Sequence, residues 1–226
     1  MRMFWASITS ADLGRLAELA ISLEDAGVDG IHVDIADGVF VPDLTFGHRV
    51  IRALTDVLSI PVEAHLMVCT PEEQLRAAAD AGASRVAFHL ESTRYPARIA
   101  SLARALGVSV GMALNPVSDM AALGYLAPGL DFINVLATEP DLEDERMLPL
   151  MIERVQLARA IFGAQLEIQV DGDVSAANIG VLAESGAQHF VVGRALVDEP
   201  DLSAALGALR SAALGVKYEA ARPSFD

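Results

Sequence analysis

Short apolar runs alternate with longer amphipathic stretches along the chain. Most of the runs are β-branched and continuously apolar, which is typical of parallel strands buried on both faces of a sheet. In the stretches between them, apolar residues recur at the spacing of one helix face, as they do over residues 12–26. The pattern therefore predicts a repeated strand–helix order. The predicted strands cover residues 3–8, 30–35, 61–66, 85–90, 109–114, 132–136, 166–170 and 190–193.

Residues with clear preferences for helix ends stand where these helices should begin and end. Ser10 or Asp12 could cap the helix over 12–26. Thr70 could cap a later helix that continues with Pro71 and two acidic residues. Glycines follow several predicted helices, where the left-handed backbone that ends a helix favours glycine. They are Gly27, Gly82, Gly107 and Gly186.

Eight strand–helix units with glycine turns predict an α/β fold, a single (β/α)8 TIM barrel, which usually has roughly 250 residues. We expect the barrel domain over residues 1–214 and a C-terminal tail over 215–226. An open doubly wound sheet is the alternative. Its dinucleotide-binding form is disfavoured because no Gly-x-Gly-x-x-Gly motif follows a predicted strand.

Two histidines and two aspartates stand at the ends of apolar runs. His32 and Asp34 share one predicted strand, and residues two apart in a strand face the same side. His65 and Asp171 end two further runs, and the carboxyl ends of barrel strands meet at one mouth. Any one of them alone is explained as a hydrogen-bonded structural residue. Together they predict a site for a divalent cation that takes imidazole and carboxylate ligands.

Two carboxylates beside one cation also predict a type of reaction. A cation acting as a Lewis acid acidifies the C–H group next to a ketose carbonyl, because it stabilises the enediolate oxygens. One aspartate could remove that proton while the other returns a proton to the opposite face. The expected outcome is epimerisation, without a redox cofactor.

The composition limits the binding partners and the cellular compartment that we expect for the protein. The formal net charge of −15 argues against nucleic acid as a partner, since a phosphate backbone requires basic surfaces. No apolar run reaches the roughly 18 residues of a membrane span, and the N-terminus lacks the pattern of a signal peptide. Cys69 is the sole cysteine, which excludes an intramolecular disulfide and fits a reducing compartment. We therefore expect a cytoplasmic protein that binds neither nucleic acid nor membranes.

Several separated segments, in the same order along the chain, resemble the signature motifs of ribulose-phosphate 3-epimerases. The longest covers residues 30–47 and begins Gly-Ile-His-Val-Asp-Ile-Ala-Asp-Gly. The resemblance runs from about Ser7 to Val197 and implies a (β/α)8 barrel. The shorter motifs are Ala-Ser-Ile-Thr-Ser-Ala-Asp-Leu at 6–13, His-Leu-Met-Val at 65–68, Asn-Pro at 115–116 and Ile-Gln-Val-Asp-Gly at 168–172.

The resemblance also implies a cofactor, a substrate class and roles for individual residues. It implies one divalent metal ion, commonly zinc or iron with manganese or cobalt also compatible, and a homo-oligomer. The expected substrate is a sugar or sugar phosphate, with ribulose 5-phosphate of pentose phosphate metabolism as the family substrate. The implied metal ligands are His32, Asp34, His65 and Asp171, the implied acid/base pair is Asp34 and Asp171, and the implied substrate contacts are Ser7, His65, Met67, Gly172, Gly193 and Arg194.

The chain departs from the family where a substrate phosphate should bind. A Gly-Phe-Gly-Gly-Gln loop follows the sixth strand in the family, whereas this chain has Asp-Leu-Glu-Asp-Glu at 141–145. Asp173 replaces a glycine after the seventh strand, and Ala36 and Leu136 replace two methionines near the metal. The acidic residues would either repel a phosphate or face solvent at a helix N-terminus.

Three functions are compatible with these observations. The first is a metal-dependent 3-epimerase of a ketose phosphate, with Arg146 or Arg194 as a substitute anion site. The second keeps the chemistry and acts on an unphosphorylated or differently phosphorylated ketose, because the loops are altered. The third is a non-catalytic metal-binding barrel, which is disfavoured because both Asp34 and Asp171 are kept.

Overall fold

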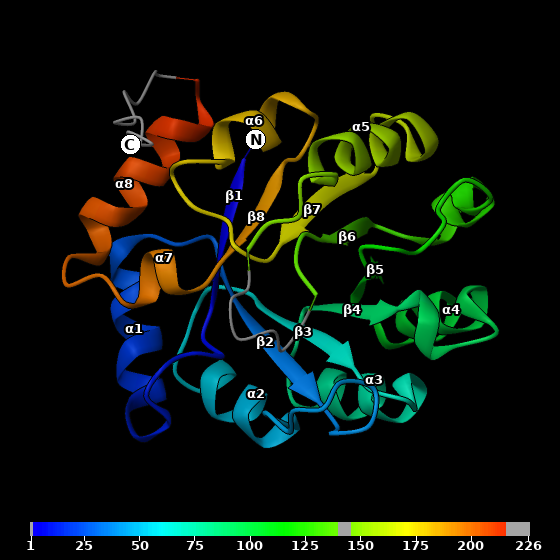
Figure 1. Cartoon of the computed structure of the whole chain (residues 1–226). Helices are drawn as coiled ribbons and strands as arrows, with labels where there is room; N and C mark the ends of the chain where they lie inside the picture. Colours follow the sequence, from blue (N-terminus) through cyan, green and yellow to red (C-terminus); the bar gives the residue numbers. More distant parts are fainter. Residues whose placement is uncertain (1, 140–145, 216–226) are drawn as a thin grey trace.

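Eight parallel strands close into a barrel in which β1 (Met3–Ser7) pairs with β8 (His189–Val192). The structure is a computed structural model that describes residues 2–139 and 146–215. In Figure 1 the strands surround the barrel axis and the helices form an outer ring. Strand order around the barrel follows the chain, so each strand lies next to its neighbours in sequence. The predicted (β/α)8 barrel is confirmed, and the open sheet is wrong.

The remaining elements alternate around this barrel. The other strands are β2 Gly30–Ala36, β3 Val62–Met67, β4 Arg85–His89, β5 Ser109–Leu114, β6 Phe132–Leu136 and β7 Glu167–Asp171. The α-helices are α1 Leu16–Ala26, α2 His48–Thr55, α3 Pro71–Asp80, α4 Pro96–Leu106, α5 Met151–Phe162, α6 Ile179–Glu184, α7 Arg194–Val197 and α8 Leu202–Ala213. The 3-10 helices are η1 Leu13–Arg15, η2 Leu90–Ser92 and η3 Leu123–Gly129.

All eight predicted strands are present, and no strand end differs from its predicted position by more than one residue. The last helix, α8, ends at Ala213. The predicted tail over 215–226 lies outside the described residues except for Gly215. Between β5 and β6 the helical segment is η3, a 3-10 helix. Pro128 lies inside η3, and proline disfavours a regular α-helix because it lacks the backbone N–H.

The helix-end signals are mostly, but not all, used as predicted. Asp12 is the cap: its carboxylate accepts the backbone N–H of Gly14 at 2.9 Å and starts η1, which leads into α1. Thr70 occupies the N-cap position of α3 and is followed by Pro71, as predicted, but its side chain makes no capping hydrogen bond. The backbone of Thr70, with ψ of 72°, lies outside the usual extended conformation of a capping residue. The predicted glycines all have positive φ: Gly27 93°, Gly82 102°, Gly107 74° and Gly186 116°.

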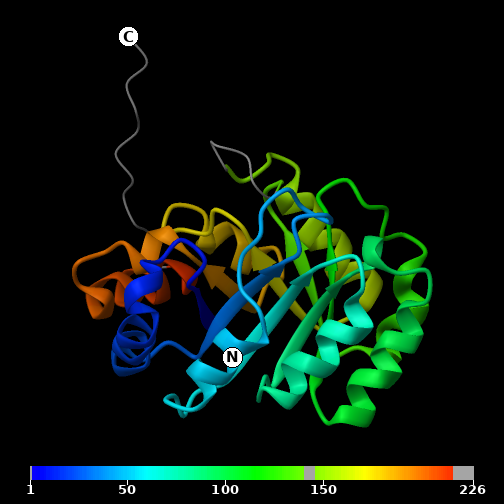
Figure 2. The same cartoon turned by 90° about the horizontal axis from the view of Figure 1, so that it is seen from below.

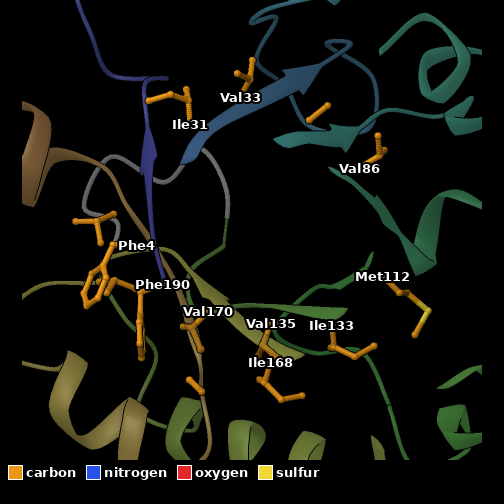
Figure 3. Close-up of a cluster of buried hydrophobic side chains, with 14 of the residues drawn as sticks. Phe4, Ile31, Val33, Val86, Met112, Ile133, Val135, Ile168, Val170 and Phe190 are labelled. Atoms are coloured by element: carbon orange, nitrogen blue, oxygen red, sulfur yellow. The ribbon is translucent and has the colours of Figure 1, made fainter. Parts of the chain in front are cut away.

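Apolar side chains on the outside of the barrel form the main core against the helices. Figure 3 shows Phe4, Val33 and Ile168 pointing away from the barrel axis, and all three are buried. Successive side chains of a strand point to opposite faces. The alternation in β2 therefore turns His32 and Asp34 toward the inside of the barrel.

Aromatic rings fill the barrel interior away from its mouth. Trp5 and Phe132 are fully buried there. A Cβ on Gly30 would lie 2.2 Å from the Trp5 ring, and a Cβ on Gly111 would lie 2.2 Å from the Phe132 ring. Both rings thus need a glycine on a strand beside them.

Among the residues that the structure describes, no helix has the length and apolar character needed to cross a bilayer.

Candidate active site and metal centre

A pocket of about 660 Å³ opens at the mouth formed by the carboxyl ends of the strands. Figure 2 shows the barrel from the side, with the segment after β2 rising above its upper end. Asp34 and Asp171 line the pocket, and His32 is fully buried beside them. The residues expected to contact substrate also line it: Ser7, His65, Met67, Gly172, Gly193 and Arg194.

His32, Asp34, His65 and Asp171 converge, and one potential ligand atom from each lies within 4.8 Å of the others. Asp34 Oδ1 lies 3.0 Å from His32 Nε2 and 2.8 Å from His65 Nδ1. Asp171 Oδ2 lies 3.4 Å from each of these two nitrogens. The structure thus brings together the four residues that the sequence singled out, from β2, β3 and β7.

Glu63 is the hydrogen-bond partner of the His32 ring nitrogen that points away from the aspartates, Nδ1. His32 Nδ1 lies 2.8 Å from Glu63 Oε1, and both side chains are fully buried. Because an ionised carboxylate only accepts hydrogen bonds, Nδ1 of His32 carries a proton, which leaves Nε2 as the nitrogen that would offer a lone pair to a bound metal. Glu63 is itself fixed by Arg85, whose Nε donates to Oε2 at 2.8 Å, and by Gln169, whose Nε2 donates to Oε1 at 2.6 Å.

Hydroxyl and amide groups orient the two aspartates. Ser7 Oγ and Thr9 Oγ1 lie 3.1 Å and 2.5 Å from Asp34 Oδ2. Asn134 donates from Nδ2 to Asp171 Oδ2 at 3.3 Å. Each carboxylate is therefore held by groups that belong to other strands or loops.

The buried charges shift several pKa values. Burial disfavours the ionised form of Asp34, but the charges and hydrogen bonds of His32 and His65 outweigh it and hold the pKa of Asp34 well below its ordinary value. Burial, with the negative charge of Asp34 nearby, raises the pKa of Asp171 in spite of the two imidazoles. Burial also raises the pKa of Glu63, but Arg85 and His32 reverse this and bring it to about 2.

The donor set fits a divalent cation. Imidazole nitrogen and carboxylate oxygen are ligands for first-row divalent metals, and the bond of His32 Nδ1 to Glu63 leaves Nε2 to face a metal. Burial alone would lower the pKa of His32, yet the charges of Asp34 and Asp171 raise it well above its ordinary value. The group therefore attracts positive charge, and its four residues could hold one metal ion.

The loops around the pocket carry both a cationic and an anionic side chain that an anionic substrate would meet. Arg194 lines the pocket, whereas Arg146 is exposed and is not among the lining residues. Asp173 also lines the pocket and has a positive φ of 48°, a conformation that glycine adopts more easily. Its Oδ2 accepts the backbone N–H of Met147 at 2.9 Å. The acidic segment 141–145 lies outside the described residues.

Residues 4–197 match the model of the ribulose-phosphate 3 epimerase family. The chain belongs to this family. Its membership makes the protein an isomerase of the epimerase type.

Several ribulose-phosphate 3-epimerases are similar to this chain over most of its length. The ribulose-phosphate 3-epimerase of Mycobacterium bovis is 35% identical over 207 residues, which are 90% of each chain. The ribulose-phosphate 3-epimerase of Escherichia coli is 32% identical over 94% of this chain and 96% of its own. Ribulose-phosphate 3-epimerase 1 of Cupriavidus necator is 34% identical over 86% of this chain and 84% of its own.

Solved structures with lower identity support the fold of the epimerase. A 3-hexulose-6-phosphate synthase superposes with a TM-score of 0.71 at 23% identity, covering 94% of this chain and 99% of its own. Orotidine 5'-phosphate decarboxylase from Pyrococcus horikoshii gives 0.67 at 18% identity, covering 95% of this chain and 100% of its own. At these identities the likeness concerns the barrel alone.

Several polar residues that support the site of this epimerase were not predicted. Glu63 and Gln169 each lie two positions before a predicted ligand, His65 and Asp171, and so face the same interior. His89 lies at the end of β4, 3.0 Å from His65 between Nε2 atoms. The available signal was a polar residue inside an otherwise apolar strand, two residues from a candidate ligand.

Proposed function

We propose that the protein is a metal-dependent 3-epimerase of a ketose phosphate, with ribulose 5-phosphate as substrate. The observation that carries this proposal is the convergence of two imidazoles and two carboxylates at the mouth pocket of an epimerase-family barrel. The substrate is inferred from the relatives named ribulose-phosphate 3-epimerase, at 32% to 35% identity.

One divalent metal ion would be held by His32, Asp34, His65 and Asp171. Zinc or iron suits two imidazoles and two carboxylates, and manganese or cobalt is also compatible with this ligand set. When bound, the cation supplies Lewis-acid stabilisation of negative charge on the substrate carbonyl oxygen. The protein's contribution is to orient the ligands, through Glu63 for His32 and through Ser7 and Thr9 for Asp34.

Asp34 and Asp171 form the acid/base pair of the proposed reaction. Asp34 comes from β2 and Asp171 from β7, so they reach the pocket from different parts of the barrel wall. In one direction the Asp34 carboxylate takes the proton from C3, and Asp171 returns a proton to the opposite face of the same carbon. The C–H bond breaks and re-forms with inverted configuration, and in the reverse direction the two aspartates exchange roles.

The remaining pocket residues bind and orient the sugar in this proposal. Ser7 contacts both Asp34 and the pocket, which places its hydroxyl beside the proton carrier. Met67 supplies an apolar wall. Gly172, Gly193 and Arg194 follow β7 and β8 and form the side on which the phosphate end would bind, with Arg194 as the cationic group.

An unphosphorylated or differently phosphorylated ketose is a second candidate substrate, favoured by Asp173. Its side chain lines the same part of the pocket, where the family has a glycine. A carboxylate about 5 Å from a phosphate charge costs roughly 3 kcal/mol at an effective dielectric constant near 20. We propose that this repulsion weakens the binding of ribulose 5-phosphate without removing the chemistry.

We propose, from the resemblance and from the sequence, a homo-oligomer in the cytoplasm. No nucleic acid or membrane is proposed as a partner.

A single comparison tests the proposed function. The purified protein, loaded with zinc or iron, is assayed with ribulose 5-phosphate and with a panel of free ketoses, and the 3-epimers are measured. Turnover of ribulose 5-phosphate supports the first candidate, and turnover confined to the free sugars supports the second. No epimerisation of any ketose by the metal-loaded protein would contradict both candidates and leave a barrel that binds metal without catalysis.

A further inference from the structure

His65 is hydrogen-bonded to a second buried histidine. Its Nε2 lies 3.0 Å from Nε2 of His89, and the ring centroids are 5.0 Å apart with 19° between the ring planes. The two residues are 1% and 0% exposed. A hydrogen bond between two imidazole nitrogens needs one nitrogen that carries a proton and one that does not. The direction of this bond therefore fixes the tautomer of both neutral rings.

The other side of His65 decides that direction. Its Nδ1 lies 2.8 Å from Asp34 Oδ1 and 3.4 Å from Asp171 Oδ2, so it faces the group that could hold a metal. A ring nitrogen that binds a metal must offer its lone pair. When Nδ1 of His65 is a ligand, the proton of the ring is on Nε2, and Nε2 donates to His89.

Glu91 holds His89 in the tautomer that can accept this proton. His89 Nδ1 lies 3.2 Å from Glu91 Oε2, and an ionised carboxylate can only accept, so Nδ1 of His89 carries the proton and Nε2 does not. Glu91 is fixed by its other oxygen, which accepts the backbone N–H of Asn115 at 3.0 Å and the hydroxyl of Ser118. His65 Nε2 thus donates to His89 Nε2, and His89 Nδ1 donates to Glu91 Oε2.

We propose that His89, held by Glu91, is a positioning residue of the metal centre. It accepts the Nε2–H of His65 and so keeps Nδ1 of His65 unprotonated and aimed at Asp34 and Asp171. The inference rests on the proposed function, because it requires a metal at this group. Glu63 acts in the same way on His32, but as a carboxylate and on the opposite ring nitrogen. The two imidazoles are thereby kept in opposite tautomers.

Two substitutions of His89 separate hydrogen bonding from packing. His89→Phe keeps a flat ring beside His65 and beside Phe40, whose ring centroid lies 4.7 Å away, but removes both nitrogens. His89→Gln can place its amide oxygen close to the position of Nε2 and so keeps an acceptor for His65. His189→Gln is the matched control, because His189 is also buried and hydrogen-bonded, to Trp5, away from the metal group.

The readout is the affinity for Co²⁺, titrated into chelator-stripped protein and followed by the visible absorption of the bound ion. His89→Phe should bind Co²⁺ about 10- to 100-fold more weakly than the parent, with a changed spectrum, as expected when the partner of a metal-binding histidine is lost. His89→Gln should stay within about threefold and His189→Gln should match the parent, since both leave His65 with an acceptor. Parent-like affinity and spectrum in His89→Phe would overturn the proposal.

Other outcomes separate this inference from the proposed function. If the parent binds no divalent ion, the metal centre itself is wrong and the positioning role falls with it. If the parent binds Co²⁺ but epimerises no ketose, the proposed function fails while the positioning role is still tested by the variants.

A second measurement does not depend on how the variants fold. Long-range ¹H–¹⁵N spectra of the zinc-loaded parent distinguish protonated from unprotonated ring nitrogens. The proposal requires His89 protonated at Nδ1 and unprotonated at Nε2. The reverse tautomer would contradict it.

Discussion

Glu63 stands directly across the sheet from His32 and holds its ring. The two residues are Cα partners in the pairing of β2 with β3, and Glu63 Oε1 lies 2.8 Å from His32 Nδ1. Arg85 balances the charge of Glu63, with Nε 2.8 Å from Oε2. The side chains of Glu63 and His32 are fully buried, and that of Arg85 is 12% exposed. Glu63 therefore has two contacts: it orients the candidate metal ligand His32, and it forms a buried ion pair with Arg85.

Glu63→Gln should destabilise the fold while keeping most of the metal affinity. Removing the charge of one partner of a buried ion pair costs about 3–5 kcal/mol, because the other charge stays buried, whereas the amide oxygen of glutamine can still accept from His32 Nδ1 and keep its tautomer. Urea unfolding and a Co²⁺ titration measure the two effects.

Glu167→Gln is the matched control for Glu63→Gln. Glu167 also pairs with Arg85, at 3.0 Å, but its side chain is 40% exposed. Its loss should cost less than about 1 kcal/mol and leave metal affinity unchanged. An equal loss of unfolding free energy in the two variants would contradict the larger contribution expected of the buried Glu63–Arg85 pair.

The pairing of Glu91 should make the stability of the protein depend on pH in acid. Burial raises the pKa of Glu91, but hydrogen bonds from His89 and Ser118 outweigh it and lower the pKa from 4.5 to about 2. A lowered carboxyl pKa contributes stability that is fully present above pH 4.5 and is lost as the pH falls from 4.5 toward 2. Allowing for its partial exposure, the contribution is about 2 kcal/mol.

Glu91→Gln should remove that part of the pH dependence. The difference in unfolding free energy between parent and variant, measured in urea between pH 7 and pH 2.5, should shrink as the pH falls. A difference that is constant over this range would mean that the Glu91 carboxylate is not stabilised by its partners.

Much of the fold could be predicted because its signals are local. Continuous apolar strands, amphipathic helices and glycines such as Gly27 and Gly107 each determine a short stretch of backbone, and the barrel follows from their repetition. The missing capping hydrogen bond of Thr70 could not be predicted, because residue preference does not specify the backbone angles before a helix. The alternating pattern predicts a helix between β5 and β6 but not its type, which is a 3-10 helix that contains Pro128.

The candidate ligands could be predicted because His32, Asp34 and Asp171 are polar residues that interrupt otherwise apolar strands. Their supporting residues could not, since the partner of His32 is Glu63, on another strand, and only the register of β2 with β3 brings the two together. The same holds for His89, which reaches His65 across β3 and β4. A residue's strand placement follows from the sequence, but the tautomer that a neighbour imposes requires the three-dimensional contact.

Removing the charge of Asp173 should improve the use of ribulose 5-phosphate. Asp173→Asn keeps an amide oxygen that can accept from Met147 and tolerates a positive φ, but it removes the repulsion of a phosphate. Because Asp173 is exposed and partly screened, KM should fall about tenfold with little change in kcat. Asp173→Gly should give a similar KM if charge is the cause. An unchanged KM in both variants would show that this loop does not limit phosphate binding.

His65→Ala should sharply lower the metal content of the purified protein. The loss of one of four ligands weakens the site, because the remaining three cannot complete the same shell. Metal per chain is measured by elemental analysis after gel filtration. His48→Ala, at an exposed histidine on α2, is the control and should retain the parent's metal content. Equal metal content in the two variants would contradict the assigned ligands.

Asp34→Asn and Asp171→Asn should each nearly abolish epimerisation, since each face of the carbon requires its own proton carrier. A loss of roughly 10²- to 10⁴-fold in kcat is expected, the usual contribution of a general acid or base. Stopped assays of 3-epimer formation, with metal content measured in parallel, separate loss of proton transfer from loss of metal. If either variant keeps its metal and retains most of the activity, that aspartate is not a proton carrier.

Solvent deuterium incorporation tests the two-carboxylate mechanism most directly. The metal-loaded protein is incubated with ribulose 5-phosphate in deuterated water, or with a free ketose if the phosphorylated sugar is not turned over, and C3 is followed by proton NMR. We expect deuterium at C3 of the product, because the proton removed by one aspartate exchanges with solvent and the other aspartate delivers a deuteron taken from solvent. Epimerisation that retains the original hydrogen at C3 throughout would contradict it.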